Sequence, residues 1–210
     1  IQQLGEPYWH RIHQLPGVWI CPIHKVILHK MIYPVSERFG LTVLPIAKSM
    51  FRSTPIAGDL SDKHLNSLSE VAVDIQMLIQ TTELLDLYKS RDIILTRLVE
   101  QGYVTGGMRI RQQKLEEQFV RFYGQSLLAM LDCLPNRNDY SWLALATRGS
   151  AGRAIHPLRM ILLYRFLYGS FNLFLKQSGQ VYAPFGEAPW PCLNKAAEHY
   201  KQPVITVCQI

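Results

Sequence analysis

Apolar side chains recur at intervals of three and four residues through most of the segment from residue 61 to residue 176, a spacing typical of amphipathic α-helices. The first such stretch follows Ser61, a residue type that favours a helix N-cap, and its apolar positions are Leu65, Leu68, Val71, Ile75 and Leu78. The pattern predicts helices over residues 61–80, 82–88, 91–101, 109–123, 126–133, 141–148, 157–168 and 170–176. We therefore expect a mainly α-helical fold.

Two of these predicted helices are joined in a way that indicates a helix-turn-helix. Gly102 is a residue type that ends helices, and "GYVTGGM" at residues 102–108 predicts a tight connection to the helix at 109–123. In that second helix the apolar residues share one face, and the other face carries mainly Arg111, Lys114, Gln118 and Arg121. A helix, a short glycine-containing turn and a second helix form the outline of a helix-turn-helix unit.

Strand patterns are confined to the two ends of the chain. "GVWI" at 17–20 and "KVIL" at 25–28 flank a Cys-Pro-Ile-His corner, and this arrangement predicts a small β-hairpin. The segment "PFGEAPWPCLN" at 184–194 is rich in proline and aromatic residues and is predicted to be a loop.

Cysteine and histidine pairs at both ends suggest metal binding. Cys21 and His24 are separated by two residues, which lets a sulfur and an imidazole nitrogen approach one zinc ion at about 2.3 and about 2.0 Å. Cys192 and His199 form a second pair with a less specific spacing. The two pairs either join in one Cys₂His₂ site, or each needs partners outside this chain. The alternative is that Cys21 is a buried thiol and His24 a surface imidazole; Cys133 is most simply a core thiol.

The sequence disfavours secretion, membrane insertion and catalysis. Four cysteines in 210 residues are too few for a disulfide framework, and we expect a reducing compartment and no signal peptide. The most apolar stretch, residues 160–175, contains Arg165 and is broken at Gly169, so it is interpreted as two buried helices. His10 and His13 lack the intervening glutamate and the spacing of a zinc-protease motif, and we expect no enzyme.

The charge of the chain favours an anionic partner. Lysine and arginine number 22 against 16 aspartate and glutamate residues, which gives a net charge of +6. Residues 137–176 contain six basic residues and one acidic residue. The excess is therefore concentrated in one window.

The segment "GEPYWHRIHQLPGVWICPIH" at residues 5–24 resembles the TniQ/TnsD family, whose members choose target sites for cut-and-paste transposons. The family has a Cys-x-x-Cys pair, then a Tyr-Trp-His-Arg-x-His-Gln-Leu-Pro-Gly-Val segment and then Cys-Pro-x-His; the last two are present here. "GYVTGGMRIRQQKLEEQFVRFYG", "SWLALATRGSAGRAIHPLRMILLYRFL" and "PFGEAPWPCLNKAAEHY" are similar to the TnsD branch. The resemblance therefore covers most of the chain.

The resemblance implies structural zinc. On this basis Cys21 and His24 are the second half of a zinc site that an upstream cysteine pair completes, and Cys192 and His199 begin another that later cysteines complete. It implies helix-turn-helix-type helical bundles with a β-hairpin zinc knuckle at the N-terminal end and a partial one at the C-terminal end. The implied divisions are residues 1–60, the second half of a TniQ-type zinc-knuckle domain; 61–180, a helical TnsD-like domain with helix-turn-helix elements; and 181–210, the start of a C-terminal knuckle.

The resemblance also implies a function. A TnsD-like protein is expected to bind a specific double-stranded DNA site and to recruit an AAA+ ATPase regulator and through it the transposase, as a bacterial cytoplasmic protein that joins the nucleoid when bound to DNA. The residues expected to contact DNA are Arg109, Arg111, Gln112, Gln113 and Lys114 at the start of one helix and Arg148, Arg153, His156 and Arg159 around a glycine-rich loop. Two alternatives remain: a TniQ adaptor linking a CRISPR RNA-guided complex to the transposition machinery, and a zinc-dependent hydrolase using His10 and His13.

Overall fold

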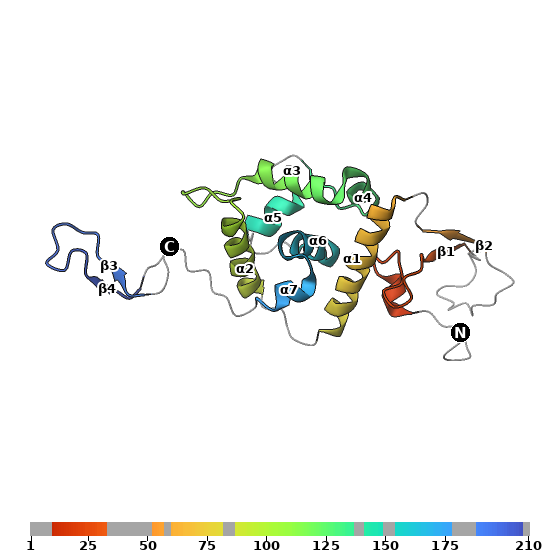
Figure 1. Cartoon of the computed structure of the whole chain (residues 1–210), viewed down its shortest axis with the longest axis horizontal. Coiled ribbons are helices and arrows are strands. Elements are labelled where there is room, and N and C mark those ends of the chain that lie inside the picture. Colours follow the sequence, from red (N-terminus) through yellow and green to blue (C-terminus); the bar gives the residue numbers. More distant parts are fainter. Residues whose placement is uncertain are drawn as a thin grey trace.

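The computed structural model describes residues 10–32, 52–56, 60–81, 87–136, 141–148, 154–177 and 188–207. Within these ranges seven α-helices dominate and form the central body of the molecule (Figure 1). They are α1 (Asp62–Gln80), α2 (Leu87–Glu100), α3 (Gln112–Tyr123), α4 (Gln125–Met130), α5 (Trp142–Arg148), α6 (Pro157–Tyr168) and α7 (Phe171–Leu175). The prediction of a mainly α-helical fold is confirmed.

Helix α6 lies at the centre of this body, and α1, α2, α5 and α7 all pack against it (Figure 1). Most of its side chains are buried, among them Leu162 and Leu163, which have no exposed surface. Pro157 occupies the first turn, where its missing N–H has no helical partner to lose. Gly169 ends the helix with φ +87°, a conformation that glycine adopts without steric cost. The most apolar stretch of the sequence is thus two buried helices, as predicted.

Helix α3 covers one side of the body and buries one of its faces. Leu115, Phe119 and Tyr123 are fully or almost fully buried, and the Tyr123 hydroxyl donates a 2.8 Å hydrogen bond to the carbonyl of Leu162 in α6. The Phe119 ring meets Trp142 of α5 edge to face with 5.5 Å between ring centroids. The helix ends at Gly124, whose φ of +87° matches the predicted stop.

The segment between α2 and α3 differs from the tight turn that was predicted. Val104 and Ile110 form an antiparallel bridge, and the Arg111 N–H donates to the Tyr103 carbonyl at 2.7 Å. These bonds make residues 103–111 a small β-hairpin, which we call the α2–α3 hairpin. The predicted helix start at Arg109 is therefore wrong: Arg109 lies in the hairpin, and the helix begins at Gln112 because the preceding backbone is engaged in strand pairing.

The strands form two small two-stranded sheets. Strand β1 (His29–Ile32) pairs antiparallel with β2 (Arg52–Pro55), and β3 (Trp190–Pro191) pairs antiparallel with β4 (Pro203–Ile205). The two sheets lie at opposite ends of the helical body (Figure 1). The hairpin predicted over residues 17–28 is formed: Ile20 and Ile27 make an antiparallel bridge, and the Leu28 N–H donates to the Trp19 carbonyl at 2.8 Å. Strand β1 begins at His29, directly after this hairpin. The predicted loop at 184–194 contains the short strand β3 in its described part.

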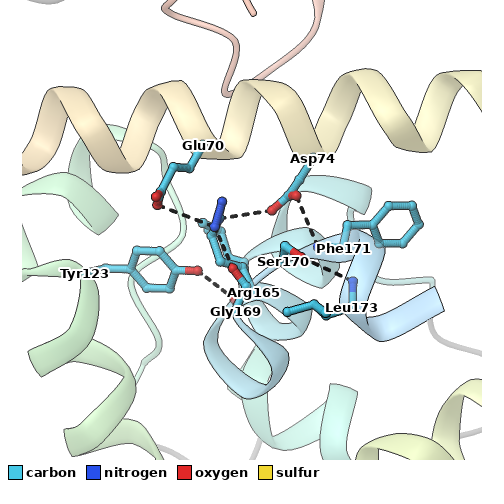
Figure 2. A network of polar contacts seen from close by, with 9 residues as sticks. Glu70, Asp74, Tyr123, Arg165, Gly169, Ser170, Phe171 and Leu173 are labelled. Carbon is cyan, nitrogen blue, oxygen red and sulfur yellow. Dashed lines mark hydrogen bonds and ion pairs between the residues drawn. The ribbon is translucent and has the colours of Figure 1, made fainter. Parts of the chain in front are cut away.

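A buried ion-pair network ties α1, α6 and α7 together (Figure 2). Arg165 of α6 places its Nε 3.0 Å from Oδ2 of Asp74 in α1, and its Nη1 donates to the Gly169 carbonyl at 2.7 Å. The other Asp74 oxygen accepts the backbone N–H of Phe171 at the start of α7, at 3.1 Å. The Nε–Oδ2 contact is an ion pair without hydrogen-bond alignment, and burial raises the pKa of Asp74 above its ordinary value, although Arg165 acts to lower it.

The segment before β1 packs on the same core. A short 3₁₀ helix, η1 (Arg11–Gln14), leads to Gly17, whose φ is +84° and whose Cα approaches Leu158 so closely that an added Cβ would lie 2.5 Å from its Cδ1. Val18 and Ile20 belong to the same buried cluster as the helices. Across the described ranges, none of the helices combines the length and apolar character needed to cross a bilayer.

Candidate nucleic-acid interface and metal knuckle

The N-terminal end of α3 is a basic, exposed surface. Arg111 occupies the N-cap position, and Arg111, Gln113 and Lys114 are exposed, as is Arg109 in the preceding hairpin. The first turn of the helix contains no acidic residue, and the side chain of the N-cap residue Arg111 makes no capping hydrogen bond. An uncapped helix N-terminus carries partial positive charge, so the arginine side chains and the helix dipole both favour an anionic ligand at this end of α3.

A hydrogen bond joins two basic segments that are distant in the sequence, the start of α3 and the end of α5. The Gln112 side-chain amide donates to Oγ1 of Thr147 in α5 at 3.1 Å. The residues next to this pair in the chain, Arg111 and Arg148, are both exposed. The structure therefore brings the start of α3 and the end of α5 to one surface, and Gln112 faces α5. Sequence patterns gave no reason to select Thr147, because a threonine inside a helix usually bonds only its own backbone.

Two other predicted contact residues already have partners within the chain. The Gln113 side-chain amide donates to Glu117 Oε1 at 3.0 Å along the exposed face of α3. The Lys114 ammonium donates to the Gly102 carbonyl at 3.2 Å and lies 5.4 Å from the centroid of the Tyr103 ring. Both contacts are solvent-exposed, so they can be exchanged for a ligand at small cost.

The second predicted cluster is largely built into the fold. The Arg159 guanidinium donates to the Asp132 carbonyl at 2.9 Å and lies 5.8 Å from the Trp142 ring centroid. His156 is the N-cap of α6, and its Nδ1 accepts the Leu158 N–H at 3.2 Å. Arg153 lies outside the described residues. Arg159 and His156 thus have structural partners.

Residues 21–26 form a tight turn, which we call the Cys/His knuckle. The Cys21 N–H donates to the Val26 carbonyl at 2.8 Å, and the Lys25 N–H returns to the Cys21 carbonyl at 2.9 Å, with φ of Lys25 at +56°. Cys21 Sγ lies 3.4 Å from His24 Nδ1. Two ligands of one tetrahedral zinc ion are separated by about 3.6 Å when one is sulfur and one nitrogen, so this geometry fits half a zinc site.

No group of three or more metal-ligating side chains exists among the described residues, so the knuckle lacks further ligands there. His13 is a further imidazole near this turn. Burial, then the neighbouring His10 and His24, lower the pKa of His13. The ring centroids of His10 and His13 are 5.0 Å apart.

The second cysteine and histidine pair has a different arrangement. Cys192 is buried beside β3 and forms a bridge with Tyr200, with its N–H donating to the Gln202 carbonyl at 3.0 Å. His199 is exposed, and its backbone carbonyl accepts the Gln202 N–H at 2.9 Å. The backbone thus closes the loop between the two residues, whereas none of the contacts in the described part of the chain joins their side chains.

The described fold is that of a mainly helical protein with a basic helix end and a Cys/His knuckle. The chain matches the family model TnsD, described as Tn7-like transposition protein D, over residues 71–210, which is more than half of its length. The chain therefore belongs to the TnsD family of transposition target-site selection proteins, and the resemblance seen in the sequence is confirmed. The Tyr-Trp-His-Arg and Cys-Pro-x-His segments lie before the matched range. No curated protein matched the chain.

Proposed function

We propose that this protein selects the insertion site of a cut-and-paste transposon by binding a specific double-stranded DNA sequence, and that it recruits an AAA+ ATPase regulator and transposase to that site. Family membership supports the first part of this proposal, since the chain belongs to the TnsD transposition proteins. The single observation that carries the DNA contact is the Gln112–Thr147 hydrogen bond, which brings two exposed basic segments to one surface. On this proposal the protein acts in the bacterial cytoplasm, on the nucleoid.

The two classes of contact have different roles. Arginines on phosphates release counterions and supply affinity for any duplex, whereas side chains that reach base edges in the major groove supply sequence choice. We assign base readout to Arg111 and Gln113 at the start of α3. Their side chains are exposed at the N-terminal end of the helix, which is the end of a recognition helix that contacts base edges in the major groove. Arg148 and Lys114, which lie beside them, would contact phosphates of the DNA backbone.

Zinc would have a structural role. Cys21 and His24 would hold it, together with ligands outside the described residues, and the ion would supply a rigid cross-link between chain segments. The knuckle follows directly on the segment that packs against α6, so a metal there would stabilise the N-terminal end of the helical body. The expected division at residue 60 is kept as a proposal for the whole protein, with residues 61–180 as the DNA-binding part.

The test is selection of bound duplexes from a random DNA library with the full-length protein. A single enriched motif supports target-site selection, whereas binding without any motif supports the adaptor of an RNA-guided complex. Arg111→Ala should then weaken binding to the selected site by about 1–3 kcal/mol and relax the preference at one position. Arg91→Ala is the matched control, because Arg91 is an exposed arginine near the far end of α2. An Arg111→Ala variant with unchanged preference would remove Arg111 from base readout.

A further inference from the structure

The α2–α3 hairpin has a base fixed in the core and an exposed tip. At the base Tyr103 is only 8% exposed, and Val104 and Ile110 are half-buried against the hydrophobic core. At the tip Gly106, Gly107, Met108 and Arg109 are exposed, and an added Cβ at either glycine would have no atom within 4 Å. A helix-turn-helix needs about three or four residues between its helices, whereas residues 101–111 connect α2 and α3 here.

The tip is an ordered turn. The Met108 N–H donates to the Thr105 carbonyl at 2.9 Å, the Thr105 N–H donates to the Arg109 carbonyl at 2.9 Å, and the Arg109 N–H donates to Thr105 Oγ1 at 3.2 Å. Five residues lie between Val104 and Ile110, and a strand residue advances about 3.3 Å, so two residue steps on each arm carry the tip roughly 7 Å beyond the bridge. The hairpin can therefore hold a fixed position against a ligand.

The charge around the hairpin is of one sign. Residues 101–115 contain Arg109, Arg111 and Lys114 and no acidic residue. The acids on either side are engaged elsewhere: Glu100 pairs with Arg97 at 2.9 Å, and Glu116 accepts a 2.7 Å hydrogen bond from Ser141. Arg109 has an exposed side chain, and the contacts of the described residues include no side-chain partner for it. This leaves an uncompensated positive charge on a projecting, glycine-tipped element.

We propose that the α2–α3 hairpin is a second DNA-contacting element, which lies on the sugar–phosphate backbone beside the groove that α3 enters, with Arg109 neutralising a phosphate. This inference rests on the proposed function. The major groove is about 12 Å wide, so a projection of the stated length from the N-terminal end of a helix in the groove reaches the phosphates at its edge. The two glycines allow the backbone of the tip to approach those phosphates closely. The hairpin supplies affinity for any duplex, and α3 supplies sequence preference.

The experiment measures the dissociation constant of the full-length protein for its selected site and for an unrelated duplex over a range of salt concentrations. The slope of log affinity against log salt is negative, and Arg109→Gln should reduce its magnitude by about 0.9, which corresponds to about fivefold weaker binding at about 0.15 M salt. Both duplexes should be affected equally, so that the ratio between them stays as in the wild type.

A charge pair at the tip provides the matched control. Gly107→Glu places a negative charge where the phosphate is expected, and Gly107→Gln adds a similar volume without charge; both side chains have open space. Gly107→Glu should weaken binding to both duplexes more than Gly107→Gln does. Wild-type protein that binds the selected site, with a relaxed preference in Arg111→Ala, would support the proposed function. If Arg109→Gln and Gly107→Glu then bind like the wild type, the hairpin assignment is wrong while the proposed function stands. If wild-type protein binds no duplex, the proposed function falls and the hairpin assignment with it.

Discussion

The buried Arg165–Asp74 pair permits a quantitative prediction for the variant Arg165→Met. Methionine keeps most of the side-chain length but removes the guanidinium that faces Asp74 at 3.0 Å and bonds the Gly169 carbonyl at 2.7 Å. Asp74 is 3% exposed, and among the residues that the structure describes it would keep the Phe171 N–H as its hydrogen-bond partner (Figure 2). Glu70 adds little to the pair in the wild type, because its side chain is 60% exposed.

The magnitude follows from the chemistry of an isolated buried carboxylate. In the variant Asp74 either stays charged without a counterion or takes up a proton. Protonating a carboxyl of ordinary pKa at pH 7 costs about 4 kcal/mol, and this value is the upper limit for the cost of leaving Asp74 without its counterion. The lost hydrogen bond to Gly169 costs about 1 kcal/mol more. The free energy of unfolding should therefore fall by about 3–5 kcal/mol at pH 7, the range measured for broken buried pairs.

The assay is urea denaturation at about pH 7 and about pH 4, with Asp74→Asn as control. Without Arg165 the folded-state pKa of Asp74 rises further, so the folded variant keeps a proton that the unfolded chain releases above about pH 3.8. The stability lost by Arg165→Met should thus be small near pH 4 and grow with rising pH. Asp74→Asn retains an acceptor for Phe171 and should cost about 1–3 kcal/mol. A loss from Arg165→Met that is below about 1 kcal/mol at pH 7, or independent of pH, refutes the reasoning.

Three further predictions concern Gly17, Arg159 and Cys21. Gly17→Ala should lower the free energy of unfolding by about 2–4 kcal/mol, because φ is +84° and the new Cβ would lie 2.5 Å from Leu158 Cδ1. The control, Gly106→Ala, should change this free energy by less than about 0.5 kcal/mol, because its Cβ would meet no atom. Equal urea midpoints for the two variants would contradict this prediction. Arg159→Ala should lower the free energy of unfolding of DNA-free protein by about 1–2 kcal/mol, since the side chain bonds the Asp132 carbonyl and lies over the Trp142 ring. A wild-type melting temperature would show that these contacts do not stabilise the fold. Cys21→Ser should lower the zinc content of the full-length protein and its melting temperature, and a chelator should lower the melting temperature of the wild type but not of the variant; zinc content equal to wild type would exclude Cys21 as a ligand.

Local pattern was sufficient for the elements that bury one regular face. The helix at 157–168 was predicted with its observed bounds, since Pro157 and Gly169 mark its ends and its apolar residues are nearly continuous. The helix beginning after Ser61 agrees equally well with the pattern. The Cys21–His24 contact also follows from spacing, because two intervening residues in a tight turn bring both side chains to one side. The proposed function rests on membership of the TnsD family, because no residue pattern by itself specified it.

Long-range pairing decided the rest. The prediction placed Arg109 in a helix, since "RIRQQKLEEQF" has helical periodicity, but pairing of Ile110 with Val104 keeps it in a hairpin; a glycine-containing loop between two β-branched residues was the signal that could have revealed this. The β1–β2 sheet and the Gln112–Thr147 bond join segments distant in sequence, so periodicity carries no information about them. Periodicity in the sequence thus determined which faces are apolar. Tertiary packing decided which polar side chains are left facing solvent, because buried groups such as the Tyr123 hydroxyl and the Asp74 carboxylate take their partners from other elements.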